Sequence, residues 1–267
     1  MGKSRKALIA IPLALAMLFV SNGVASNAVY HAVEGDMFKN VARSAKSDDS
    51  VLRFSVGELT GYITASDYSS PRRTIIYFGG AGEIAYNTVL KYKDTFRDFV
   101  FICVDYPGTS DSGGDFSTKD MQKAAYAIYD YVLRLKFVDT AHIYSVGYSY
   151  GTGMATYLAS ERDCAGLVLV SPYRDTADIV NSKLKIPSIF FRGFITGNIK
   201  TKAYAQEVSE PTLIITSDAD EVFSTKIARS LAGSFKDARV SEFSGLSHPE
   251  YLVNSSVIKE ITAFCGG

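Results

Sequence analysis

The feature that most constrains the fold is an alternation of short apolar segments with helix-like segments. Runs such as Phe99–Val104 are apolar at every position, which is typical of strands buried on both faces. Between them, segments such as Thr118–Leu135 have apolar residues three or four positions apart, the spacing of a helix face. Such alternation predicts a parallel sheet covered by helices on both sides. The predicted strands are Arg73–Phe78, Phe99–Val104, Ile143–Val146, Leu167–Val170, Thr212–Thr216 and Ala238–Phe243, and the predicted helices are Ile84–Arg97, Thr118–Leu135, Thr152–Ser160, Val222–Leu231 and Pro249–Phe264.

Two further strands precede this alternation. Val51–Val56 and Glu58–Thr64 flank Gly57 and predict an antiparallel hairpin. The sequence therefore predicts one α/β domain over residues 51–267, with an eight-stranded, mostly parallel sheet and helices on both faces. The longest gap between strands, residues 173–210, predicts a short insertion that forms a lid or pocket wall.

The N-terminal segment has the pattern of a secretory signal. Three cations in the first six residues precede an uncharged run at 7–20, and small polar residues follow. The run is shorter than the about 20 residues that a spanning helix needs. We expect residues 1–26 to be a signal peptide or an uncleaved membrane anchor and 27–50 to be a linker. The protein would then be exported, or attached to a membrane through residues 7–20.

The composition excludes several kinds of partner and cofactor. Lysines and arginines number 28 and acidic residues number 28, so the chain lacks the basic excess of a nucleic-acid-binding protein. Three histidines and three cysteines without paired spacing offer little for a metal site, and we expect no cofactor. Cys103 lies in an apolar run that predicts a buried thiol. A disulfide between Cys164 and Cys265 stays open.

The motif with the clearest chemistry is Gly147-Tyr148-Ser149-Tyr150-Gly151. The G-x-S-x-G pattern is common by chance, but here it closes a predicted strand and opens a predicted helix. That setting predicts a nucleophile elbow, in which the serine sits on a tight, strained turn and the glycines leave room for it. Ser149 is therefore the candidate nucleophile.

A serine hydroxyl needs a base beside it, and the base needs an orienting carboxylate. His248 is the one histidine after Ser149, and it follows the last predicted strand. The acid should lie between the two in sequence. Asp218 and Asp220 both follow the strand Thr212–Thr216, and Glu221 is a third possibility.

Two backbone N–H groups should stabilise the oxyanion. One belongs to Tyr150, the residue after the nucleophile. The other should come from the glycine-rich loop after the strand Arg73–Phe78, where we choose Ala81. A phosphate-binding loop is the alternative reading of these glycines, but the segment does not match G-x-G-x-x-G.

Several segments in order resemble the α/β-hydrolase superfamily from about Arg73 to the C-terminus. They are Tyr77-Phe78-Gly79-Gly80-Ala81-Gly82-Glu83, Val104-Asp105-Tyr106-Pro107-Gly108, Gly147-Tyr148-Ser149-Tyr150-Gly151, Val170-Ser171-Pro172-Tyr173, Asp220-Glu221-Val222 and Gly245-Leu246-Ser247-His248. The chain is most similar to small serine hydrolases with an F-G-G-N-A-E type oxyanion loop, a group that includes protein depalmitoylases. This resemblance implies a Ser149–Asp220–His248 triad, because the family's acid precedes x-Val. The usual Asn-Ala of the loop is Ala81-Gly82 here, so any bond from the Asn side chain is lost.

Aromatic side chains around the motif predict an apolar substrate site. Tyr148 and Tyr173 are the candidate substrate-binding residues. We expect a hydrolase of carboxylic esters or thioesters that acts on a small-molecule or acylated substrate. An amide or peptide hydrolase and a catalytically silent binding protein are the alternatives.

Overall fold

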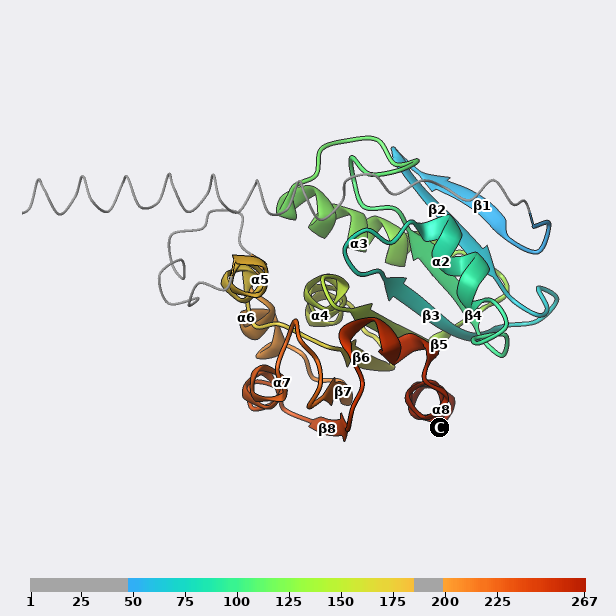
Figure 1. Cartoon of the computed structure of the whole chain (residues 1–267). Coiled ribbons are helices and arrows are strands. Elements are labelled where there is room, and N and C mark those ends of the chain that lie inside the picture. The colour runs from blue at the N-terminus through green and yellow to red at the C-terminus, as the bar shows by residue number, and fades with distance from the viewer. Residues whose placement is uncertain (1–47, 185–198) are drawn as a thin grey trace, which may run out of the picture.

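The computed structural model describes residues 48–184 and 199–267, which form a sheet between two layers of helices (Figure 1). The strands are β1 (Leu52–Val56), β2 (Leu59–Thr64), β3 (Arg72–Phe78), β4 (Val100–Val104), β5 (Val138–Tyr148), β6 (Gly166–Val170), β7 (Thr212–Ser217) and β8 (Ala238–Phe243). Their order across the sheet is β1-β2-β4-β3-β5-β6-β7-β8. The strands β1, β2 and β4 pair antiparallel, and every pair from β4 to β8 is parallel. The eight-stranded, mostly parallel sheet and its hairpin are confirmed.

The sheet has a separate apolar core on each face. Along β3, Ile76 and Phe78 enter one core whereas Ile75 and Tyr77 enter the other, because successive side chains of a strand point to opposite faces. The first core packs against α3 (Thr118–Val132), α4 (Gly151–Glu161), α5 (Thr176–Leu184), α6 (Thr201–Ala205) and α7 (Thr225–Ala232), and the second packs against α2 (Ala85–Tyr92), the 3₁₀ helix η2 (His248–Val253) and α8 (Ser255–Gly266). Burial on both faces explains why these strands are continuously apolar.

The helix expected to reach Arg97 ends earlier, because α2 stops at Tyr92. A turn follows, in which the Phe96 N–H donates to the Tyr92 carbonyl (3.0 Å). This turn brings the Phe96 ring into the core, where it stacks on Phe101 with centroids 4.9 Å apart. Burial of the ring therefore outweighs continuation of the helix.

The last two predicted helices also differ from the observed ones. The helix expected from Val222 begins at Thr225, because the preceding backbone N–H groups bond to the side chain of Asp220. The single helix expected over 249–264 is divided into η2 and α8 at Asn254. The Asn254 carboxamide accepts from the Ser256 and Val257 N–H groups and so starts α8.

All three cysteines are buried free thiols. Cys164 belongs to the core on one side of the sheet, and Cys265 to the core on the other. The open possibility of a Cys164–Cys265 disulfide is therefore not realised. Burial raises the pKa of each thiol, first of all through desolvation, which keeps the thiols in their neutral form.

Two parts of the predicted domain organisation fall wholly or partly outside the residues that the structure describes. The expected signal segment at 1–26, its apolar run at 7–20 and nearly all of the expected linker lie outside the described residues. Of the expected insertion, α5 and α6 are described and residues 185–198 are not. Within the described ranges, no helix combines the length and the apolar character needed to span a bilayer.

The turn from β5 to α4 lies at the middle of the sheet and is packed without spare room. Ser149 has a φ of +51°, in the left-handed region that side chains rarely adopt. A Cβ on Gly151 would lie 2.0 Å from the Phe78 carbonyl oxygen, and one on Gly147 would lie 2.7 Å from the Gly151 oxygen. Both glycines are therefore required for β3, β5 and α4 to approach one another.

We predict that Gly151→Ala lowers the free energy of unfolding by about 2 kcal/mol or more, because its methyl group meets backbone that cannot move aside. Gly233→Ala is the matched control. Gly233 has a φ of −65°, and its added Cβ would lie 3.9 Å from the nearest atom. Denaturant unfolding of the parent and both variants measures the difference. Equal stability of the two variants would contradict the packing assigned to this turn.

Candidate active site

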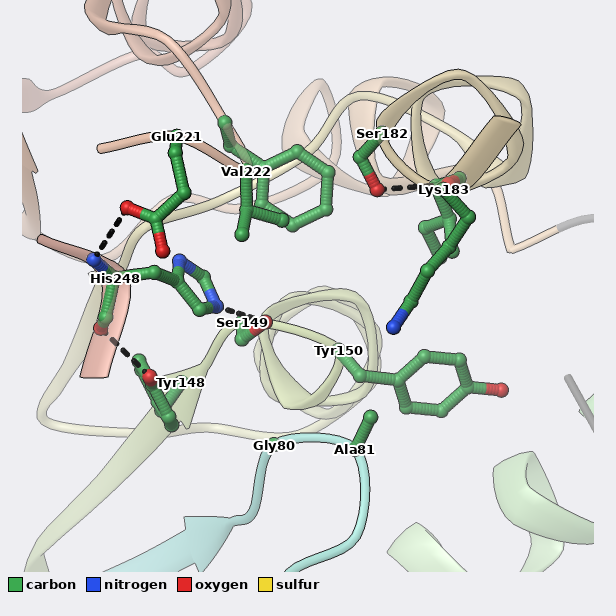
Figure 2. Close-up of a pocket in the computed structure, with 12 residues that line it drawn as sticks. Gly80, Ala81, Tyr148, Ser149, Tyr150, Ser182, Lys183, Glu221, Val222 and His248 are labelled. Carbon is green, nitrogen blue, oxygen red and sulfur yellow. Dashed lines mark hydrogen bonds between the residues drawn. The ribbon is translucent and has the colours of Figure 1, made fainter. Parts of the chain in front are cut away.

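The loops that follow β3, β5, β7 and β8 meet at the carboxyl edge of the sheet, where they surround a cavity of about 290 Å³ (Figure 2). Parallel strands end at the same edge, so residues far apart in sequence come together there. The cavity is lined by Gly80, Ala81, Tyr148, Ser149, Tyr150, Ile179, Ser182, Lys183, Glu221, Val222, Phe223 and His248.

Ser149 and His248 are in direct contact. The Ser149 Oγ lies 2.8 Å from the His248 Nε2, although the two residues are 99 positions apart in sequence. The Ser149 N–H donates to the Val170 carbonyl at the end of β6 (2.9 Å), which fixes the turn against the neighbouring strand. The hydroxyl is thus presented to the cavity beside a nitrogen that can accept its proton.

Asp220 lies on the other side of the imidazole. Its Oδ1 and Oδ2 are 3.1 and 3.2 Å from the His248 Nδ1. Asp218, in contrast, accepts from the Gly245 N–H (2.7 Å) in an exposed position, and a Glu221 carboxylate oxygen accepts from the His248 backbone N–H (3.0 Å). Among the three acids weighed from the sequence, Asp220 alone has a hydrogen-bonding contact with the imidazole in the described residues.

The environment keeps Asp220 ionised. Burial is the largest single effect on its pKa and raises it, but hydrogen bonds with His248 and Ser171 and the charge of His248 together outweigh burial. The pKa falls to about 2. The carboxylate also accepts from the N–H groups of Val222 and Phe223, at 2.8 and 3.0 Å. It is therefore negatively charged and held in orientation at neutral pH.

Ser171 is a polar neighbour of this group that the sequence analysis did not identify. Its Oγ donates to the Asp220 Oδ2 (2.5 Å) and lies 3.1 Å from the His248 Nδ1. It is fully buried and has a φ of +52°, close to that of Ser149 one strand away. Its position directly after a predicted strand at the same sheet edge was the available signal. The segment Val170-Ser171-Pro172-Tyr173 carried part of the family resemblance, but it assigned no role to the Ser171 hydroxyl.

The loop after β3 is held in place by Glu83. One carboxylate oxygen of Glu83 accepts from the Gly80 N–H (2.7 Å) and from the Tyr77 hydroxyl (2.8 Å). Ala81 therefore lines the cavity beside Ser149, and its N–H makes no hydrogen bond within the described residues. Tyr150, the other expected donor, also lines the cavity at the start of α4, where backbone N–H groups point out of the helix end.

The two tyrosines expected to contact substrate have different positions. Tyr148 lines the cavity, stacks on the His248 ring with centroids 5.3 Å apart, and donates its hydroxyl to the His248 carbonyl (2.8 Å). Tyr173 does not line the cavity. It is fully buried, and its hydroxyl donates to the Tyr150 carbonyl (3.1 Å). Tyr173 was expected to contact the substrate. In the structure it contacts the backbone of Tyr150 and does not reach the cavity.

The described residues contain no cluster of three or more metal-ligating side chains. The Ser149–His248–Asp220 arrangement can instead supply a hydroxyl nucleophile, a base and an orienting carboxylate, and the neighbouring N–H groups can stabilise an oxyanion. These are the parts needed for acyl transfer through a serine ester.

Sequence comparison provides little about function. No protein-family model matches the chain. Two curated proteins of Mycobacterium tuberculosis, Uncharacterized protein Rv2307c and Uncharacterized protein MT2364, are each 26% identical over 163 residues. The match covers 60% of this chain and 57% of each relative, so the chain matches little more than half the length of these proteins.

Solved structures provide a stronger comparison. Est1E from Butyrivibrio proteoclasticus superimposes with a TM-score of 0.61 at 16% identity, over 82% of this chain and 100% of that one. The Pyrococcus furiosus esterase Pf2001 has a TM-score of 0.65 at 14% identity, over 85% and 96%. The fold is that of the α/β-hydrolases. DcsB, solved in complex with a substrate analogue, matches this chain with a TM-score of 0.65 at 15% identity, over 81% and 98%.

We predict that Ser171→Gly slows phosphonylation of Ser149 by a fluorophosphonate about tenfold to a hundredfold, because the hydrogen bond to a buried carboxylate is lost. Glycine adopts the φ of +52° without strain, so Ser171→Gly separates loss of the hydroxyl from backbone strain. Ser145→Ala is the control, since it removes another buried hydroxyl, which donates to the Ala155 carbonyl. Parent-like labelling of Ser171→Gly would show that this hydroxyl has no positioning role.

Proposed function

We propose that this α/β-hydrolase cleaves carboxylic esters or thioesters through an acyl-enzyme on Ser149. The observation that carries the proposal is the continuous contact from the Ser149 Oγ through the His248 imidazole to the Asp220 carboxylate. Several of the structural neighbours are esterases, which agrees with ester hydrolysis as the reaction class.

In the proposed reaction, the Ser149 Oγ attacks the substrate carbonyl carbon and gives its proton to the His248 Nε2. The negative charge on the tetrahedral oxygen is stabilised by the N–H groups of Ala81 and Tyr150. The imidazolium, oriented by Asp220, then protonates the leaving alcohol or thiol as the carbon–oxygen or carbon–sulfur bond breaks. A water molecule then attacks the acyl carbon and gives one proton to His248. His248 passes this proton to the Ser149 Oγ as the bond between Oγ and the acyl carbon breaks, and the carboxylic acid leaves.

The size of the cavity favours a small acyl group. A volume of about 290 Å³ is near the lower end of the range for ligand pockets, roughly 300–1,000 Å³. Its apolar wall includes Ile179, Val222 and Phe223. Solved neighbours contain ligands of this scale: ferulic acid is bound to Est1E, and propionate and butyrate are bound to Thermogutta terrifontis esterase 2. We favour short aliphatic or single-ring acyl groups over the long chains implied by the resemblance to depalmitoylases.

We also propose that the reaction takes place outside the cytoplasm. The basic N-terminus and the uncharged run at 7–20 support export or membrane attachment. The neutral overall charge supports a small-molecule or acylated substrate over a nucleic acid.

A substrate panel tests the proposed reaction class. We expect the parent protein to hydrolyse 4-nitrophenyl acetate and butyrate, and a butyryl thioester, faster than 4-nitrophenyl palmitate, and not to cleave aminoacyl 4-nitroanilides detectably. Ser149→Ala is expected to lower ester turnover on the order of 10⁴- to 10⁶-fold, because the triad acts as a unit.

Two results would reject this proposal in different ways. Cleavage of the anilides as fast as the esters would indicate an amide or peptide hydrolase. No turnover of any substrate, together with unchanged binding of the acids by Ser149→Ala, would indicate a catalytically silent binding protein.

A further inference from the structure

The cavity wall contains one cationic side chain among the described residues, and that side chain extends into the cavity. Lys183 belongs to the last turn of α5, and Figure 2 shows its side chain reaching from the helix toward Tyr150. The wall also contains one carboxylate, that of Glu221, which accepts from the His248 backbone N–H (3.0 Å). Figure 2 shows Glu221 beside His248 and Lys183 at the other end of the cavity, so the ammonium has no acid next to it in the described wall.

Lys183 has no hydrogen bond or ion pair within the described residues. The acid of α5, Asp178, is paired with Arg174 (2.7 Å) and does not line the cavity. An ammonium group in a cavity wall attracts anionic groups and repels cationic ones.

The position of Lys183 identifies which part of a substrate it would meet. In the proposed reaction, His248 protonates the leaving group, so the leaving group must lie on the His248 side of Ser149. Figure 2 shows Lys183 on the opposite side of Ser149 from His248, with its side chain directed toward Tyr150. A group near the Lys183 ammonium would therefore belong to the acyl portion of the substrate.

We propose that Lys183 selects substrates whose acyl chain has an anionic group, a carboxylate or a phosphate, at its far end. This inference rests on the proposed esterase function and adds the substrate class to it. The apolar residues Ile179, Val222 and Phe223 would contact the middle of the acyl chain, and the ammonium would hydrogen-bond its charged end. Such a substrate is a half-ester of a diacid or a similar bifunctional acid.

The test compares mono-4-nitrophenyl adipate, which carries a free carboxylate, with its neutral methyl ester of the same chain length. We expect the parent protein to prefer the charged ester, and Lys183→Met to lower the ratio of the two kcat/KM values about tenfold. The loss in kcat/KM should be larger for the charged ester than for the neutral ester. Lys183→Arg should retain the preference, and Lys183→Glu should reverse it.

Lys202→Met is the matched control, because it removes a positive charge from α6 in the same insertion but outside the cavity wall. It should leave the ratio unchanged. The proposal is overturned if Lys183→Met also leaves the ratio unchanged, or if it slows both esters equally, which would place the ammonium at the reaction centre. A preference that appears only with 4-carboxyphenyl butyrate would place the anion on the leaving group and also reject the proposal.

These results separate the inference from the function on which it rests. Hydrolysis of both esters with a ratio independent of Lys183 rejects the anionic acyl group alone. If the parent protein hydrolyses neither ester, the proposed function fails as well.

Discussion

The left-handed turn at Ser149 is the constraint on which the site depends. This turn forces the hydroxyl out of the sheet edge at the junction of β5 and α4, and it is possible only because Gly147 and Gly151 present no Cβ to the surrounding backbone. The strain at Ser149 is compensated by the buried parallel strands on either side, since β5 lies between β3 and β6. The position of the Ser149 hydroxyl is thus a property of the packed sheet and not of a loop.

The same edge of the sheet contains two carboxyl groups whose pKa values are shifted in opposite directions, those of Asp220 and Glu83. Asp220 must remain charged although it is buried, and its bonds with His248 and Ser171 lower its pKa against the effect of burial. Glu83, which bonds to the loop after β3, shows the reverse balance. Desolvation raises its pKa more than its hydrogen bonds with Gly80 and Tyr77 lower it. One carboxyl group therefore orients the imidazole as an anion, while the other shapes the loop that contains Ala81.

Sequence alone predicted most of what depends on local pattern. The continuous apolar runs that became β4 and β6 identified a doubly covered parallel sheet, and the motif at Ser149 identified the turn between β5 and α4. The end of α2 could not be predicted in this way, because the tertiary burial of Phe96 decides it. The spacing of apolar residues along the chain does not reveal such a contact.

The same limit applies within the site. Tyr173 lies in an aromatic-rich segment, but only its packing beneath Tyr150 shows that it is removed from the cavity. Ser171 and Lys183 gained significance from their distances and directions relative to Asp220 and Ser149, which no residue spacing encodes. The motifs in the sequence therefore identified the proposed catalytic residues, whereas only the geometry identified the residues proposed to position them or to select the substrate.

The most direct test of Ser149 as the nucleophile is mass spectrometry of the protein quenched with acid during turnover of 4-nitrophenyl butyrate. We expect one butyryl group per chain, located on the peptide that contains Ser149 and absent from Ser149→Ala. A butyryl group on another residue, or undiminished hydrolysis by Ser149→Ala, would contradict the assignment of Ser149 as the nucleophile.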